Sequence, residues 1–283
     1  MSPPNEVDLD PQEKDILREW RELLVEHYTE DIKRLKGNPA LVHGFEIEHA
    51  LMDRSETLRR EFHLSPTRTL SLGTRVLQEQ FEQHTVRMRP VIRVVGLSDN
   101  YLRQVDDLRM RDRNQVVCVD VHISDVSPPY GWLCLAVYQC IDCSHQVHLF
   151  QRRGRERESP TFCEPCLDRM IERMGDDDAP FPPFPRRGRF KMLVEDCKYE
   201  DVQDIRMNQV VYNDEHYILN TSSKHPLIGT MANDLVGEIG QVKYARINGI
   251  VRVQPVPDRN FAKDTRRILS LDVLSVEPLP LKE

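Results

Sequence analysis

The chain has 283 residues, of which 39% are hydrophobic and 30% are charged, and its formal net charge at pH 7 is −7. This length suits two or three small domains or one elaborated domain. The negative charge excludes a uniformly basic nucleic-acid binder, but basic residues gather locally at 152–157, 186–191 and 259–267, so a local basic surface is compatible with the sequence.

The sequence gives no sign of a membrane or secreted protein. No apolar run approaches the roughly 18 residues that a membrane-spanning helix needs. The first residues, 1–6, have neither the basic nor the apolar segment of a signal peptide. We therefore expect an intracellular protein, in which two cysteines separated by two residues more often bind a metal than form a disulfide.

Residues 1–89 are predicted to form a helical subdomain. Asp10 and Pro11 suit the cap and the first position of a helix, and apolar residues then recur at three- and four-residue spacing from Ile16 to Leu35. The helices that we expect in this subdomain lie around 10–35, 47–62 and 70–84. Their charged outer faces are typical of a small bundle in solvent.

From Pro90 onward, short runs of β-branched and aromatic residues predict a small barrel or sandwich. The expected strands lie at 91–95, 115–123, 132–138, 190–195, 202–207, 241–247, 250–253 and 267–274. We assign 90–137 and 176–283 to two parts of this strand-rich fold, with 138–175 inserted between them. The proline-rich stretch 176–188 is expected to be a surface connection, either a plain linker or a segment that docks a partner.

Four cysteines form the most specific pattern in the chain. Two residues separate Cys140 from Cys143, two separate Cys163 from Cys166, and nineteen lie between the pairs. Two residues between cysteines let one tight turn aim both sulfurs at a single ion, and two such turns complete a tetrahedron. The spacing predicts a structural Zn²⁺ site with no open coordination position.

Three other arrangements stay open from the spacing alone. The cysteines can pair as disulfides, the four thiolates can hold an iron–sulfur cluster, or His145 or His148 can replace one cysteine as a ligand. Cys118, Cys134 and Cys197 lie in strand-like runs and are expected to be small core residues.

Motifs of common active sites are absent from the sequence. It contains neither a G-x-x-x-x-G-K-[ST] phosphate loop nor a G-x-G-x-x-G turn, and no H-E-x-x-H or G-x-S-x-G motif. The acidic run 176–178 has ligands for Mg²⁺, but a solubilising acidic tip is the simpler interpretation. We expect no enzyme active site in this chain.

The order of these elements resembles the amino-terminal region of minichromosome maintenance (MCM) replicative DNA helicases, over roughly residues 10–277. The stretch 190–207 is similar to the segment that follows the zinc knuckle in that family, with Asp201 and Gln203 at the places of an aspartate and a glutamine that open a barrel strand. Further similar segments are Pro226, 233–236, 240–242 and 249–250.

The chain also departs from the family pattern. Asn208-Gln209 replace the usual Gln-Glu, Ile239-Gly240-Gln241 replace Pro-Gly-Asp, and Leu227 replaces arginine. These differences indicate a divergent member. Because the ATPase motor of the family is missing, the chain is either an excised amino-terminal region or a motorless relative. The lack of long polar tails favours an archaeal cytoplasm or nucleoid over a eukaryotic nucleus.

The resemblance implies an OB-fold β-barrel that carries a zinc knuckle at 138–175. It also implies hexamers or double hexamers around single- or double-stranded DNA, contact between rings through the knuckle, and association with other replisome proteins. A basic β-hairpin near 252–267 would point into the central channel. Its cations are Arg252, Arg259, Lys263, Arg266 and Arg267, and weaker candidates on barrel strands or their edges are Arg206, Lys191 and Arg189.

These basic residues also have other interpretations. Phe261 is expected to stack on a base if the hairpin grips DNA, whereas a solvated basic loop is the simpler alternative. Arg152, Arg153, Arg155 and Arg157 either touch duplex DNA or a facing ring, or form a solvated tip. A scaffold that binds helicase subunits without gripping DNA, and an enzyme decorated by a zinc ribbon, are the rival functions.

Overall fold

The computed structural model describes residues 10–36, 42–81, 89–151, 157–174, 187–212, 217–219, 226–240, 242–255 and 266–279. The chain divides into two compact units. Unit 1 consists of Met1–Pro129, Val202–Val253 and Arg267–Glu283, and unit 2 consists of Tyr130–Asp201 and Gln254–Arg266.

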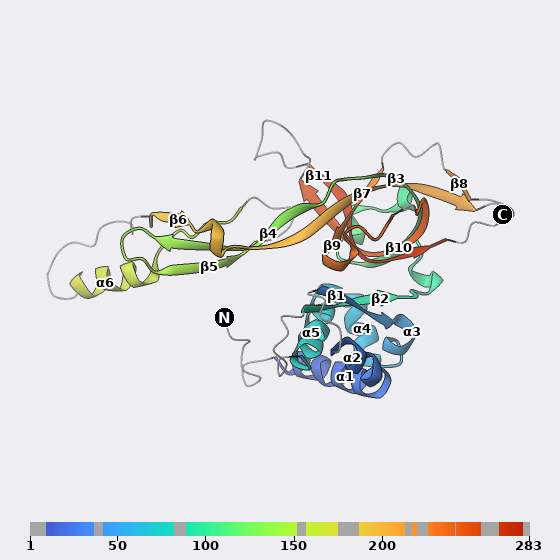
Figure 1. Cartoon of the computed structure of the whole chain (residues 1–283), viewed down its shortest axis with the longest axis horizontal. Helices are drawn as coiled ribbons and strands as arrows, with labels where there is room; N and C mark the ends of the chain where they lie inside the picture. Colours follow the sequence, from blue (N-terminus) through green and yellow to red (C-terminus); the bar gives the residue numbers. More distant parts are fainter. Residues whose placement is uncertain are drawn as a thin grey trace. The chain divides into compact units, whose positions relative to one another are not determined.

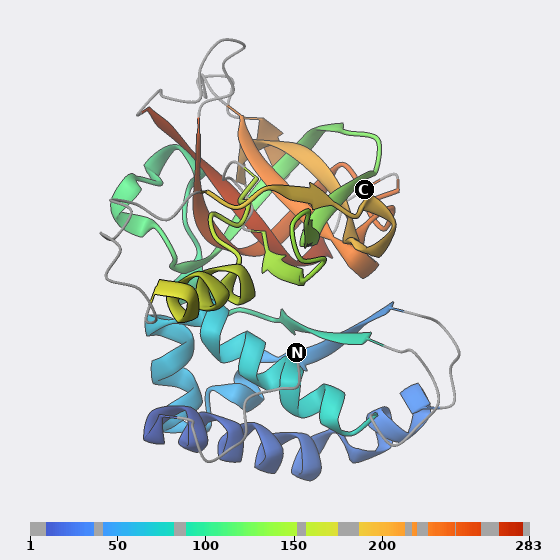
Figure 2. The same cartoon turned by 90° about the vertical axis from the view of Figure 1, so that its left-hand side faces the viewer.

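Unit 1 contains a helical part with a small sheet. Its helices are α1 (Pro11–His27), α2 (Thr29–Lys36), α3 (His49–Met52), α4 (Glu56–Leu64) and α5 (Pro66–Glu79). Its sheet consists of the parallel strands β1 (Val42–Glu48) and β2 (Arg89–Val95). The helices lie together on one side of these two strands, as Figures 1 and 2 both show.

Helix α1 forms where the apolar spacing predicts it. The Asp10 carboxylate accepts a hydrogen bond from the backbone N–H of Gln12 at 3.5 Å, and Pro11 occupies the first turn. Trp20 lies fully buried, and its indole N–H donates to the carbonyl of Thr69 on α5 at 2.9 Å. A Cβ at Gly73 would lie 2.5 Å from the Trp20 ring, so glycine lets α5 approach α1 closely.

Two helical expectations are wrong in part. The first helix ends at His27, and a second helix begins at Thr29. The expected helix over 47–62 starts only after β1, and it is divided into α3 and α4. The stretch 42–48 becomes a strand because it pairs with β2, an interaction that local spacing does not reveal.

The expectation that 91–95 belongs to the barrel is also wrong. These residues lie in β2, which pairs in parallel with β1 from Val42↔Arg89 to Glu48↔Val95. Phe45 and Ile47 alternate into the helical core, as a period of two requires. The helical part therefore extends through β2.

The rest of unit 1 is a closed β-barrel. Its strands are β3 (Val116–Val126), β7 (Lys198–Tyr212), β9 (Leu227–Ala232), β10 (Tyr244–Pro255) and β11 (Arg267–Pro278). They are hydrogen-bonded in the order β3-β10-β11-β9-β7, and β7 pairs back to β3. Numbered along the chain, this ring reads 1-2-3-5-4-1, with the third and fifth strands parallel. This is the five-stranded OB-fold barrel.

Strand β3 shows how the barrel and the helical part share one strand. The side chains that alternate along β3 into the barrel core are Val117, Val119, Val121 and Ile123. Val116 and Cys118 face the opposite way and pack in the hydrophobic cluster of the helical part. Cys118 is thus the small core residue that the sequence predicts.

Polar contacts also join β2 to the barrel. The Arg93 guanidinium, whose side chain is 8% exposed, forms an ion pair with Asp234 at 2.5 Å and donates to the carbonyl of Ala232 at 2.8 Å. The Ser275 hydroxyl donates to the carbonyl of Val94 at 2.8 Å. Two side chains and one backbone carbonyl of the barrel therefore satisfy or neutralise groups on one strand of the helical part.

The remaining short elements complete unit 1. Strand β8 (Tyr217–Leu219) pairs with the end of β7. The 3₁₀ helices are η2 (Asp99–Tyr101), η3 (Val105–Asp107), η4 (Met110–Asp112) and η6 (Asn233–Leu235).

Unit 2 is built on a long strand that pairs on both sides. Its elements are β4 (Tyr130–Cys140), β5 (Gln146–Phe150), helix α6 (Glu164–Met174), β6 (Phe190–Met192), η5 (Val194–Asp196) and the first residues of β7. Strand β4 pairs antiparallel with both β5 and β6, and α6 lies next to this sheet (Figure 1). Cys134 and Cys197 are half-buried in unit 2, so they are less enclosed than the sequence suggests.

Candidate metal centre and basic surfaces

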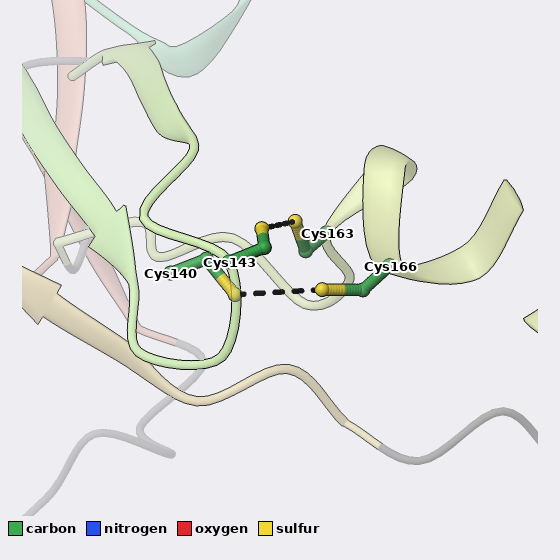
Figure 3. A group of neighbouring side chains, drawn as sticks. All are labelled: Cys140, Cys143, Cys163 and Cys166. Atoms are coloured by element: carbon green, nitrogen blue, oxygen red, sulfur yellow. Dashed lines mark hydrogen bonds between the residues drawn. The ribbon is translucent and has the colours of Figure 1, made fainter. Parts of the chain in front are cut away.

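The four cysteines come together in unit 2 from two segments. Cys140 ends β4, Cys143 lies in the turn that follows, Cys163 precedes α6, and Cys166 lies in the first turn of α6. Their side chains point toward one another in Figure 3. The Sγ atoms of Cys143 and Cys163 are 3.3 Å apart, those of Cys140 and Cys166 are 3.8 Å apart, and all four lie within 4.8 Å of one another.

Each pair of cysteines is held by a turn of its own backbone. In the first pair, the N–H of Cys140 donates to the carbonyl of His145 at 2.9 Å, and the N–H of Ser144 donates back to Cys140 at 2.9 Å. Ser144 has a φ of 61°, which closes the turn tightly. In the second pair, the carbonyl of Cys163 accepts the N–H of Cys166 at 3.1 Å.

The geometry fits a tetrahedral metal ion. Zinc–sulfur bonds of about 2.3 Å place the four sulfurs of a tetrahedron about 3.8 Å apart, which is close to the sulfur–sulfur distances within the cluster. The potential ligand group found among the described residues contains these four cysteines, and neither His145 nor His148 belongs to it. The thiols are free rather than joined as disulfides. Four thiolates without a histidine are the donor set of a closed structural site.

The protonation of the sulfurs depends on their surroundings. A backbone N–H at His145 donates to the sulfur of Cys143 and lowers the pKa of that thiol to about 7. Burial raises the pKa of the Cys163 thiol to about 12, because a buried thiolate loses its hydration. A bound divalent cation replaces these protons and stabilises all four thiolates together.

Two arginines lie beside the cysteine cluster. Arg169 on α6 donates from Nη2 to the Sγ of Cys166 at 3.4 Å. Arg189 forms an ion pair with Asp142, between Cys140 and Cys143, at 2.5 Å. Sequence reasoning missed Arg169, because helix α6, which brings it next to Cys166 one turn away, was not predicted.

The weaker DNA-contact candidates lie in different units of the structure. Arg189 and Lys191 lie in unit 2, where Lys191 on β6 faces Gln139 of β4, so their assignment to barrel strands is wrong. Charge alone cannot distinguish a barrel strand from a neighbouring sheet. Arg206 does lie on the barrel strand β7, with a side chain that is 62% exposed and 3.8 Å from Asp125.

The hairpin candidates also differ. Arg252 donates to Asp272 at 2.7 Å and to the Thr67 hydroxyl at 2.8 Å, so its charge is balanced within unit 1. Arg266 and Arg267 are exposed at the start of β11. The candidates that lie outside the described residues are Arg259, Phe261, Lys263, Arg152, Arg153 and Arg155. The fourth residue of that last group, Arg157, is exposed in unit 2.

Hydropathy adds one negative finding. Among the helices of the described residues, none has the length and apolar character to cross a membrane.

Comparisons with known proteins support the fold. No family model and no curated protein matches the sequence. A solved structure does match: the crystal structure of the N-terminal domain of an archaeal MCM, with a TM-score of 0.68 and 17% sequence identity. The alignment covers 94% of this chain and 98% of that one. This chain therefore shares the fold of the N-terminal domain of that archaeal MCM.

Proposed function

We propose that this chain is a DNA-binding, ring-forming module of the MCM type, which encircles DNA during replication. The observation that carries the proposal is the place of the basic segment in the barrel. Strands β10 and β11 are the fourth and fifth strands of the OB-fold, and residues 256–266 connect them. In OB-folds, the loop between the fourth and fifth strands takes part in oligonucleotide binding.

The charges near this connection support the same conclusion. The sequence places Arg259, Lys263 and Arg266 in it, and Arg267 begins β11; Arg266 and Arg267 are exposed. Arg206 lies on the second barrel strand, opposite Ile228 of the third, which belongs to the face that OB-folds use for oligonucleotides. Arg252 contributes less, because Asp272 already balances its charge.

The mechanism is electrostatic and independent of sequence. Lysine and arginine side chains neutralise phosphates and release counterions, which gives affinity that falls steeply as salt rises. In a ring, the few cations of each subunit come together as a dense circle of positive charge. Such a circle attracts DNA even though each chain carries a net charge of −7.

The cysteine cluster completes the module as a structural Zn²⁺ centre. The ligands would be Cys140, Cys143, Cys163 and Cys166, and the ion would brace unit 2 rather than activate water. Metal analysis separates zinc from an iron–sulfur cluster, because the cluster would contain iron and sulfide and would be coloured. In this proposal the chain performs no catalysis, and unwinding requires an ATPase motor in the full protein or in partner subunits.

Contact between rings is assigned to unit 2. Several of its large apolar side chains lie on the surface, namely Ile141, Phe150, Phe162 and Ile171. Exposed large apolar side chains favour a contact with protein, where they can be buried.

DNA binding is tested by fluorescence anisotropy at low salt with labelled single- and double-stranded oligonucleotides. Replacing Arg259, Lys263 and Arg267 together by alanine is expected to weaken binding at least about tenfold and to flatten the salt dependence. The matched control replaces Lys14, Lys33 and Arg34, exposed cations of α1 and α2, and removes the same charge. Equal affinity of the hairpin variant and the native chain would show that the hairpin does not grip DNA.

A motorless scaffold that binds helicase subunits is the second candidate. The exposed apolar side chains of unit 2 favour it, because they suit a protein partner better than DNA. Measuring binding to purified helicase subunits and to DNA under the same conditions separates the two functions. Tight binding to the subunits with no salt-sensitive binding to DNA would favour the scaffold.

A further inference from the structure

A tetrathiolate metal centre carries excess negative charge, which its surroundings must stabilise. Four thiolates and one divalent cation carry a net charge of −2, and the burial of Cys140 and Cys163 makes that charge costly. Hydrogen bonds to the sulfurs reduce this cost and orient the ligands. The donors around the four sulfurs therefore determine how tightly the centre holds its metal.

Backbone groups stabilise part of the negative charge on the sulfurs. The backbone N–H of His145 donates to the sulfur of Cys143. Helix α6 begins at Glu164, so Cys163 and Cys166 also lie at its positive end. These groups carry only partial charges.

Arg169 supplies a full positive charge. Its Nη2 donates to the Sγ of Cys166 at 3.4 Å, while its Nε donates to the carbonyl of Pro165 at 3.1 Å. The second bond fixes the plane of the guanidinium, which aims the first at the sulfur. The guanidinium keeps this charge at any physiological pH, because arginine does not lose its proton in that range.

Other arginines of unit 2 are engaged differently. Arg189 pairs with the carboxylate of Asp142 rather than with a sulfur ligand. Arg157 contacts a thioether, the Sδ of Met192, at 4.0 Å. Among the described contacts, the cation that reaches a ligand sulfur is Arg169.

We infer that Arg169 is a positioning residue of the metal centre, one that orients the Cys166 thiolate and offsets the negative charge of the four sulfurs. The inference rests on the proposed zinc centre. It predicts that the guanidinium raises the affinity for the metal and withdraws electron density from one ligand sulfur. A purely structural role on the helix surface would do neither.

Three variants of the full chain test the inference. Arg169→Met keeps the length of the side chain but removes its charge and donors, Arg169→Lys keeps the charge, and Arg157→Met is the matched control. Zinc affinity is measured by competition with a chromogenic chelator. The sulfur-to-cobalt charge-transfer band is recorded at saturating Co²⁺, so that it reports ligand electronics independently of affinity.

We expect Arg169→Met to weaken zinc binding about tenfold to a hundredfold, the usual effect of removing a group that hydrogen-bonds a ligand, and to move the cobalt band to lower energy. Arg169→Lys should recover part of both effects, and Arg157→Met should match the native chain. An affinity within twofold of native for Arg169→Met would overturn the inference. So would a loss of affinity with an unmoved band. A native chain without a tetrathiolate cobalt spectrum would overturn the metal centre itself.

Discussion

Units 1 and 2 reach a folded state by different physical means. Unit 1 buries two large hydrophobic clusters, one in the helical part and one in the barrel. Among the described residues of unit 2, the buried hydrophobic ones are few, namely Leu135, Ala136, Val137, Tyr138, Cys140 and Cys163. Two of these are proposed metal ligands. In unit 2, where apolar residues are scarce, a bound metal ion would stabilise the fold as the hydrophobic cores do in unit 1.

The largest effect is expected from removing the metal, which should destabilise unit 2 and leave unit 1 folded. Replacing Cys143 by serine, or chelating the metal, is expected to remove roughly 10 kcal/mol of binding free energy that is coupled to folding around the cysteine cluster. Hydrogen exchange should show that β5 and α6 lose protection while α1 and β10 keep theirs. The fluorescence of Trp20, recorded in a Trp132→Phe background, should stay unchanged. Simultaneous loss of the Trp20 signal would show that the two units do not fold separately.

A smaller effect is expected from the ion pair that joins the helical part of unit 1 to its barrel. Arg93→Met leaves the Asp234 carboxylate, which is 17% exposed, without its partner at low dielectric. We expect a loss of about 3 kcal/mol in the free energy of unfolding of unit 1, measured by urea denaturation, with unchanged zinc content. The control is Arg93→Met combined with Asp234→Asn, which should recover part of the loss. No recovery would mean that packing rather than charge carries the contact.

The smallest effect concerns pH and unit 1. Burial lowers the pKa of His49, against an opposing influence of the nearby Asp53 carboxylate. The unfolded chain therefore binds more protons at this histidine, so its contribution to stability is complete above about pH 6.5 and falls as the pH drops through the folded pKa.

The test compares the unfolding free energies of the native chain and of His49→Asn at pH 7.5 and 5.5. The native chain should lose more stability on acidification than the variant. His49 packs against the rings of Phe62 and Tyr101, so the substitution also changes packing, which the comparison across pH cancels. Equal losses in both chains would contradict a lowered pKa.

Local patterns in the sequence were sufficient to predict several elements of the structure. The spacing of apolar residues predicts α1 because Ile16, Trp20 and Leu24 need only one buried face, which a single helix provides. The two pairs of cysteines predict a cluster because each pair closes within one turn. Runs of β-branched residues placed β3, β7 and β11, but they divided β10 into two strands and missed β9 (Leu227–Ala232).

Features that depend on distant partners were not predictable from local patterns. Strand β1 contains Gly44 and forms because β2, more than forty residues later, offers a parallel partner. Arg252 reads as a free cation in the sequence, but the fold places Asp272 against it. The fold likewise places Arg189 beside Asp142 in unit 2. Pairing of charges is a property of tertiary structure, whereas spacing is a property of the sequence.

The native mass of the particle, with and without DNA, tests the central claim most directly. Mass photometry on the full chain at low salt should find a closed ring, expected to be a hexamer or a double hexamer. Added DNA should increase the mass of this ring without dissociating it. A particle with the mass of a single chain under both conditions would contradict a ring that encircles DNA.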